Sequence, residues 1–485
     1  MWSRSASFAA VVGTYLLLLV HDVLAISKLS AVGSKFFNEE GQQFFVKGIA
    51  YQLTPKDPLV DSEQCKLDSS LMKELGANAI RVYHVDPEGD HEECMKTFAD
   101  AGIYLFVDLD DFPTQIEGKS PIWSQRQFDA FKLTLDEFQK YDNTAGVFVG
   151  NEVLTTANDS IAAPYILSAT RDIKAYRDSK NYRKIPVGYS AADIAELRPM
   201  LQNYLVCRED ESERLDFFAL NAYEWCGKST FEVSGYSNLN DQAEGYPVPI
   251  FFSETGCNTV RPREFEDLNA ILGPEMTGTW SGAMVYEWIE ELNNYGLISY
   301  GKPPEGDKSN PSALDGFSRR GTPTPIKPDF TNLKSRFASL SPTGVELSDY
   351  SRQASKITAP PCPSSTPHSW DVDPSADLPS IGQSGVGQTN PTSTRGEASG
   401  EAGGKASATP SSSSAGNRQM PILGFLMKKV HGSKCIYRFF GRYQPNDVSV
   451  TRTHTRYTEV QDKPFLHTIV RLPAFSMSVP LGKQS

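Results

Sequence analysis

The sequence has few of the residues and patterns that metal, nucleotide or nucleic-acid sites require. Only seven His are spread over 485 residues and no two cysteines stand in CxxC spacing, so a zinc site finds no support. No GxGxxG motif opens a strand–helix unit, which excludes a standard dinucleotide site. The net charge of −12 argues against a nucleic-acid partner for the folded part and suits a neutral substrate. We therefore expect no metal and no cofactor.

The apolar run near the N-terminus is short for a transmembrane helix. It extends from Phe8 to Val20, which is 13 residues, and it follows Arg4. Small residues ending at Ala25 come next. This order predicts a secretory signal peptide at residues 1–25, with a membrane anchor as the alternative. The mature chain is then expected to fold in an oxidising compartment.

The seven cysteines suit that compartment. Six precede a low-complexity region and allow fifteen pairings, among which the residues alone do not choose: Cys65, Cys94, Cys207, Cys226, Cys257 and Cys362. Cys435 lies alone beyond that region. The triplet Asn158-Asp159-Ser160 predicts N-glycosylation of Asn158 on a surface loop.

Eight apolar runs alternate with amphipathic stretches between residues 26 and 330. The predicted strands are 43–51, 77–83, 103–109, 146–150, 186–190, 216–223, 247–254 and 282–287. Stretches such as SQRQFDAFKLTLDEFQKY between them carry apolar residues at helical spacing. This count and length predict an α/β fold, a (β/α)8 TIM barrel over 26–330, with an open doubly wound sheet as the alternative.

The pattern changes past residue 330. Residues 331–362 are expected to form an extension docked on the barrel and to end at Cys362. Residues 363–420 are dominated by Ser, Pro, Gly, Thr and Ala, which predicts a disordered, O-glycosylated stalk. Residues 421–485 hold ten Lys and Arg against three Asp and Glu, a local charge of +7, and are expected to be poorly ordered.

Polar side chains stand at the ends of the predicted strands, where a barrel of this kind places its active site. They include Gln52, Tyr83, Asp108, Asn151, Glu152, Tyr223, Glu254 and Tyr286. Glu152 and Glu254 each end a strongly apolar strand, VFVGNE and IFFSE, so both are expected to be held rigidly. A single glutamate in such a place is more often a helix cap or a solvated residue, but the pair favours a functional site.

Two facing carboxylates are the minimal equipment for breaking a glycosidic bond. One must be protonated to donate to the departing oxygen, and the other must be ionised to attack or stabilise the anomeric carbon. Mutual repulsion and unequal burial separate their pKa values. For a reaction that retains configuration, the carboxyl groups of Glu152 and Glu254 are expected about 5–5.5 Å apart.

Several long blocks between about residues 28 and 330 match a known family in order. They are FFVKGIAYQ, GANAIRVYHVD, FVGNEV, KNYRKIPVGYSAAD, NAYEWCGKSTFEVSGY, IFFSETGCN and YEWIEELNNYGLIS. With them the chain resembles the fungal β-1,3-glucanosyltransferases of glycoside hydrolase family 72. The resemblance implies Glu152 as acid/base and Glu254 as nucleophile. It implies a sugar cleft lined by Gln52, Tyr83, Asp108, Asn151, Tyr223, Tyr286 and Tyr295. It also implies the disulfides Cys65–Cys94, Cys226–Cys257 and Cys207–Cys362.

The implied activity cleaves an internal β-1,3-glucan linkage and transfers the new reducing end to the non-reducing end of another chain. Donor and acceptor chains of cell-wall β-1,3-glucan are then the expected partners. Two alternatives are an endo-β-1,3-glucanase, which transfers to water, and a wall-binding glycoprotein without catalysis.

The chain departs from the family pattern in two places. The loop after the third strand reads DLDDFPTQIEGKSPIW, whereas family members usually have a Ser-rich loop there. The C-terminal stretch LPAFSMSVPLGKQS is too short and polar for the usual GPI signal. We expect secretion to the cell surface, in the wall or at the outer plasma membrane, with any membrane contact only through a GPI anchor.

Overall fold

The computed structural model describes residues 26–53, 57–302 and 316–384. The predicted signal peptide at 1–25, the basic segment 421–485 and Cys435 lie outside these residues.

Eight parallel strands close into a barrel in the order β10-β11-β4-β5-β6-β7-β8-β9. The strands are β4 (Val46–Ala50), β5 (Ala79–Val82), β6 (Tyr104–Asp108), β7 (Thr144–Asn151), β8 (Val187–Ala192), β9 (Phe217–Asn221), β10 (Ile250–Thr255) and β11 (Trp280–Val285). All eight predicted strands occur, and the (β/α)8 class is confirmed. The predicted first strand at 43–51 contains two elements, because β3 (Gln43–Phe44) pairs with β2 (Lys35–Phe37) outside the barrel.

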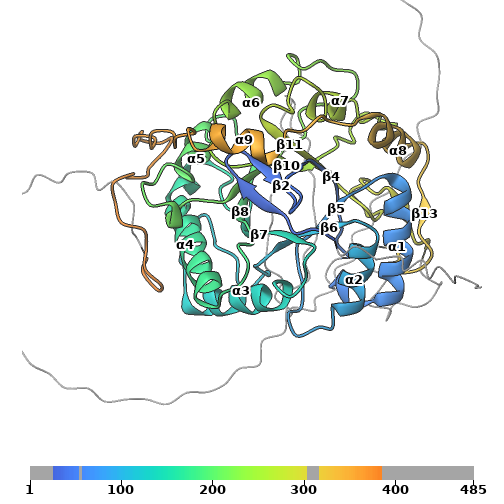
Figure 1. The fold of residues 1–485 in the computed structure, drawn as a ribbon, viewed down its shortest axis with the longest axis horizontal. Coiled ribbons are helices and arrows are strands. Elements are labelled where there is room, and N and C mark those ends of the chain that lie inside the picture. The colour runs from blue at the N-terminus through green and yellow to red at the C-terminus, as the bar shows by residue number, and fades with distance from the viewer. Residues whose placement is uncertain (1–25, 54–56, 303–315, 385–485) are drawn as a thin grey trace, which may run out of the picture. The chain divides into compact units, whose positions relative to one another are not determined.

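Helices surround the barrel strands (Figure 1). They are α1 (Ser62–Leu75), α2 (Glu92–Asp100), α3 (Gln125–Phe138), α4 (Ala163–Ser179), α5 (Arg198–Tyr204), α6 (Tyr236–Ala243), α7 (Asp267–Ile271) and α8 (Asp329–Ser339). Local sequence sets their ends. Helix α1 begins after Asp61, whose carboxylate accepts from the backbone N–H of Gln64 at 3.2 Å. It ends at Gly76, whose φ of +92° suits glycine.

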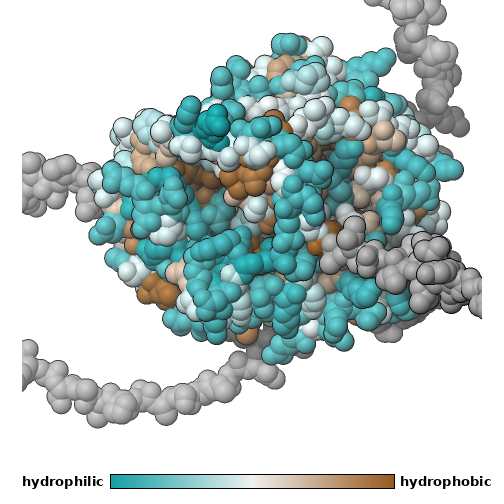
Figure 2. Space-filling view, in the orientation of Figure 1, coloured by the Kyte–Doolittle hydropathy of each residue, from teal (hydrophilic) through white to brown (hydrophobic). Residues whose placement is uncertain are grey.

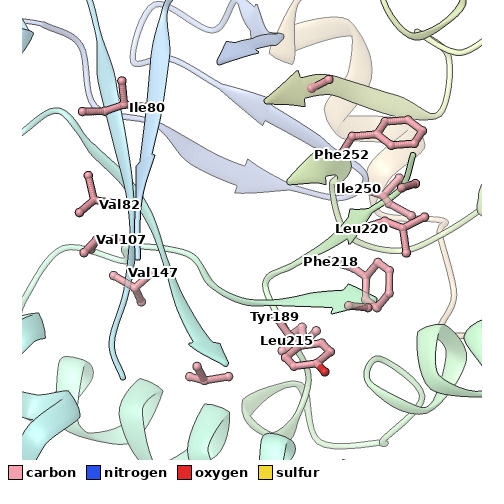
Figure 3. Close-up of a cluster of buried hydrophobic side chains, with 14 of the residues drawn as sticks. Ile80, Val82, Val107, Val147, Tyr189, Leu215, Phe218, Leu220, Ile250 and Phe252 are labelled. Atoms are coloured by element: carbon pink, nitrogen blue, oxygen red, sulfur yellow. The ribbon is translucent and has the colours of Figure 1, made fainter. Parts of the chain in front are cut away.

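Side chains alternate between two apolar layers along the barrel strands. On β5, Ile80 and Val82 point outward and join the layer between strands and helices, part of which Figure 3 shows. Ala79 points inward and joins the barrel interior. This alternation is the period of two expected for a strand.

An antiparallel sheet outside the barrel contributes a ring to the barrel interior. It consists of β1 (Ser30–Val32), β2 (Lys35–Phe37) and β3. The ring of Phe36 on β2 lies 6.0–6.1 Å from the rings of Phe106, Phe217 and Phe251. Aromatic side chains therefore fill this part of the barrel interior. The polar side chains lie at the strand ends.

Two predicted boundaries fall inside packed structure. Helix α8 begins at Asp329, so the boundary at residue 330 lies in its first turn. Residues 363–384, beyond the second boundary, also pack on the barrel, although their composition is that of a linker. Trp370 is fully buried, and its ring centroid lies 5.5 Å from that of Tyr204. The hydroxyl of Ser168 donates to the carbonyl of Pro379 at 2.9 Å.

Three disulfides join the cysteines that the family resemblance implies. They are Cys65–Cys94, Cys207–Cys362 and Cys226–Cys257. Cys207–Cys362 closes the longest loop, 155 residues, and fixes the start of the segment that leads to Trp370. Helix α9 (Leu347–Ala354) precedes that cysteine and buries Tyr350 against Phe37 of β2.

The surface in view in Figure 2 is mostly hydrophilic. Within the described residues, no helix has the length and apolarity needed to cross a membrane.

We predict that Trp370→Ala lowers the free energy of unfolding by about 3–5 kcal/mol, because it removes a fully buried indole and leaves a cavity. Chemical denaturation followed by fluorescence measures this. The control is Ile381→Ala, which alters a 37% exposed side chain of the same segment and should cost at most about 0.5 kcal/mol. Equal small losses for both variants would show that residues 363–384 are not part of the core.

Candidate active site

Arg81 on β5 is the buried centre of the polar cluster at the strand ends. Its Nε and Nη2 donate to the carboxylate of Asp108 at 3.0 and 2.8 Å. Its Nη1 donates to Ser190 Oγ at 3.0 Å, and its Nη2 donates to Asn151 Oδ1 at 3.1 Å. Glu254 Oε1 lies 3.7 Å from Nη1. A buried cation must be paired, so this one joins the ends of β6, β7, β8 and β10.

A break in strand register brings Glu254 to this cluster. The pairing of β10 with β9 shifts between Phe252 and Glu254. Ser253 Oγ donates to Asn221 Oδ1 at 2.8 Å, while its neighbour Glu254 contacts Arg81. Consecutive side chains of a regular strand point to opposite faces, and a bulge re-aims one of them. The irregularity therefore lets both side chains face the same cluster.

The same device operates at Glu152. The pairing of β7 with β8 shifts between Phe148 and Asn151. As a result, Asn151 Oδ1 and Glu152 Oε1 both accept from Asn221 Nδ2, at 3.1 and 2.9 Å. Glu152 has a φ of +49°, in the left-handed region. Such a backbone costs a non-glycine residue about 1–3 kcal/mol, so the surrounding contacts must hold it.

Glu254 is surrounded by groups that favour its charged form. Tyr83 donates its hydroxyl to Oε1 at 2.9 Å, and Tyr223 donates its hydroxyl to Oε2 at 2.7 Å. Burial and the charge of Glu152 nevertheless raise the pKa of Glu254 to about 7, against the opposing effect of Arg81. Burial also raises the pKa of Glu152.

The charge of Glu152 raises the pKa of Glu254, so the two glutamates titrate as a coupled pair. Their hydrogen-bonding environments differ. Glu254 accepts from two phenols and faces a guanidinium, whereas Glu152 accepts from one amide. Because hydrogen bonds and a nearby cation stabilise a carboxylate, these contacts favour the charged form of Glu254 more than that of Glu152.

Asp108 and Gln52, which are also predicted to contact the sugar, engage protein groups as well. Both oxygens of Asp108 accept from Arg81, and Asp108 is 2% exposed. Gln52 Oε1 accepts from the backbone N–H groups of Tyr83 and His84, at 2.9 and 3.0 Å. In this arrangement Asp108 holds the guanidinium, and Gln52 positions the chain that carries Tyr83.

Three of the predicted tyrosines, Tyr223, Tyr286 and Tyr295, form one cluster. The ring of Tyr295 lies 5.6 Å from that of Tyr223 and 5.3 Å from that of Tyr286. Tyr223 and Tyr286 are 6.5 Å apart in an edge-to-face arrangement. The cluster lies beside Glu254 through the hydroxyl of Tyr223. The predicted glycosylation site Asn158 lies apart from it and is exposed, on a short 3-10 helix (Ala157–Ala162).

Sequence reasoning did not single out Arg81 or Asn221. The signal for Arg81 was present, because it is the one charged residue in the apolar run ANAIRVY. Asn221 gave no such signal, since its role depends on side chains from β7, β8 and β10 meeting above the barrel.

Residues 19–315 match the family model of the glucanosyltransferases of glycoside hydrolase family 72. The chain belongs to this family. It is 40% identical over 359 residues to Protein EPD1 of Candida maltosa, an alignment covering 72% of this chain and 61% of that protein. It is 39% identical over 348 residues to 1,3-beta-glucanosyltransferase PGA5 of Candida albicans, covering 67% and 52%. The chain thus spans less than two thirds of the length of these two relatives.

A solved structure is similar in fold and sequence. It is a mutant of Saccharomyces cerevisiae Gas2p in complex with laminaritetraose and laminaripentaose. The TM-score is 0.64 and the identity 37%, over 72% of this chain and 74% of that one.

We predict that Arg81→Met in this family 72 chain costs about 3–5 kcal/mol of unfolding free energy, because the buried carboxylate of Asp108 loses its partner. Without Arg81, the folded-state pKa of Asp108 lies further above the unfolded value, so the loss grows as pH rises from 5 to 8. Denaturation at both pH values measures it.

The double variant Arg81→Met/Asp108→Asn tests the cause, because it removes the unpaired charge and should recover part of the loss at pH 8. Lys96→Met is the control, since Lys96 pairs with Asp100 on the exposed surface and should cost at most about 1 kcal/mol. A loss that neither depends on pH nor responds to Asp108→Asn would refute the pairing argument.

Proposed function

We propose that this chain is a retaining β-1,3-glucanosyltransferase that elongates cell-wall glucan. It cleaves an internal linkage of one β-1,3-glucan and transfers the new reducing end to the non-reducing end of another. The observation that carries the proposal is the half-buried Glu152–Glu254 pair with unequal hydrogen bonding. Family membership supports the substrate class, because a relative is named 1,3-beta-glucanosyltransferase and the yeast structure contains laminari-oligosaccharides.

In the first step Glu254 attacks the anomeric carbon of an internal glucose. Its carboxylate is the anion of the pair and is aimed by Tyr83 and Tyr223. Glu152 donates its proton to the glycosidic oxygen, and the reducing-end fragment leaves as an alcohol. The products are a covalent glucosyl ester on Glu254 and an ionised Glu152.

Forming the ester removes the negative charge of Glu254. The pKa of Glu152 then depends only on its remaining neighbours. Glu152 is then a carboxylate beside Asn221, able to act as a base. It takes the proton from the 3-hydroxyl of an incoming glucan, whose oxygen attacks the anomeric carbon and releases Glu254. Two inversions restore the β configuration, and Glu152 is protonated again.

Transfer and hydrolysis use the same two glutamates. The outcome depends on whether the site holds an acceptor sugar in an attacking position better than it admits water, an advantage measured as effective molarity. Family membership favours transfer. An endo-β-1,3-glucanase remains the second candidate, since its machinery would be identical.

We also propose that the protein acts outside the cell, at the wall or the outer face of the plasma membrane. Three disulfides are typical of chains that fold in an oxidising compartment. Asn158 is exposed and thus accessible to a glycan. The GPI anchor and the signal peptide stay predictions, because both fall outside the described residues.

We predict that the protein converts a reduced laminari-oligosaccharide into products longer and shorter than the substrate, as resolved by chromatography. Glu152→Gln should slow turnover about 10²- to 10⁴-fold, because it removes the proton donor. Glu254→Gln should slow it at least as much, because it removes the nucleophile. Glu63→Gln, which changes a 78% exposed side chain, is the matched control and should keep full activity.

If all products were shorter than the substrate, the activity would be hydrolysis and not transfer. A wild-type protein that binds the oligosaccharide without turning it over would favour the wall-binding glycoprotein.

We predict that Tyr223→Phe moves the acidic limb of the kcat/KM profile to higher pH. The variant keeps the ring but removes a hydrogen bond to the carboxylate of Glu254, so the pKa of Glu254 rises. A hydrogen bond to a charged group is worth about 1.5–3 kcal/mol, which corresponds to about one to two pH units.

The matched control for this pH profile is Tyr176→Phe, which removes a phenol that donates to Asp136 on the helices outside the barrel. It should leave the profile in place. A shift of the alkaline limb instead of the acidic one would reverse the roles assigned to the two glutamates.

A further inference from the structure

An aromatic ring stands exposed near the catalytic cluster, on a loop that departs from the family pattern. Phe112 follows β6 in the stretch DLDDFPTQ and is 41% exposed. Its ring lies 4.2 Å from that of His84, at an interplanar angle of 33°. We call His84, Asp111 and Phe112 the rim platform.

The rim platform is held in place by the site itself. Gln52 Oε1 accepts from the backbone N–H groups of both Tyr83 and His84. Tyr83 in turn donates its hydroxyl to Glu254 at 2.9 Å. The backbone that presents His84 is therefore continuous with the residue that touches the nucleophile.

The loop that carries Phe112 is also braced. Asp111 Oδ1 accepts from the backbone N–H of Phe112 at 2.8 Å and lies 3.4 Å from His84 Nδ1. Thr114 Oγ1 accepts from the backbone N–H of Asp111 at 2.9 Å, and the N–H of Thr114 donates to the carbonyl of Asp111. A ring fixed in this way loses little conformational freedom when a ligand packs on it.

The rim platform lies across the barrel from the tyrosine cluster. In the closed order of strands, β6 is opposite β10 and β5 is opposite β9. Phe112 and His84 follow β6 and β5, whereas Tyr223 follows β9. Aromatic side chains thus follow strands on opposite sides of the barrel. A polymer laid across the strand ends would meet the tyrosines on one side and the rim platform on the other.

We propose that the rim platform is a sugar-binding subsite for a glucose unit of the glucan some distance from the cleaved linkage. The ring of Phe112 packs on the apolar face of the glucose, and the half-exposed carboxylate of Asp111 accepts hydrogen bonds from its hydroxyls. This inference rests on the proposed glucan substrate. It adds a residue that sets the preferred chain length.

The test compares substrates of increasing length. For Phe112→Ala, KM for long reduced laminari-oligosaccharides should rise about two- to tenfold, because one aromatic contact is lost. KM for the shortest oligosaccharide that the wild type turns over should stay unchanged, and so should kcat. Phe112→Trp keeps a flat aromatic face and should preserve the wild-type length dependence, whereas Phe112→Leu keeps only apolarity and should lose it. Leu133→Ala removes another exposed apolar side chain, on α3, and should change nothing.

The pattern of failure separates this inference from the proposed function. A wild type that turns over glucan, with Phe112→Ala altering all lengths equally or none, would overturn the subsite and leave the function standing. A wild type that turns over no glucan would overturn both. Among supporting results, a lower ratio of transfer to hydrolysis would place the subsite on the acceptor side, and an unchanged ratio would place it on the donor side.

Discussion

The buried guanidinium of Arg81 is the constraint on which the site depends. A cation under the mouth of an aromatic-filled barrel is stable only if its charge and its N–H groups are all matched. Asp108 neutralises it through two hydrogen bonds, and the remaining donors fix Ser190 and Asn151. Glu254 then faces a cation that cannot move. This charge and the hydroxyls of Tyr83 and Tyr223 together favour the ionised form of Glu254.

The side chains of the proposed catalytic site also depend on breaks in the regularity of the sheet. A barrel strand presents every second residue to the interior, which would allow only one of Asn151 and Glu152, and only one of Ser253 and Glu254, to face the cluster. Register shifts in β7 and β10 bring both members of each pair to the mouth. The left-handed backbone of Glu152 adds strain at the same point, as functional sites often do.

The sequence predicts the eight strands and the two glutamates because both depend on local pattern. An apolar run such as VFVGNE indicates by its composition that it is buried. A carboxylate that directly follows such a strand in a barrel lies at the mouth of the barrel. Arg81 and Asn221 depend on partners from several strands, which no local pattern shows. The packing of residues 363–384 was missed for a related reason. The composition around Trp370 is that of a linker and does not indicate burial. Trp370 is buried against Tyr204, which is far from it in the sequence.

The central claim is that Glu254 carries the charge and attacks, while Glu152 carries the proton. A laminari-oligosaccharyl fluoride with fluorine at the 2-position slows release of the ester and so traps it, and peptide mass spectrometry then locates the sugar. The account predicts one adduct, on the peptide that contains Glu254. An adduct on Glu152, or turnover that inverts the anomeric configuration without any adduct, would contradict it.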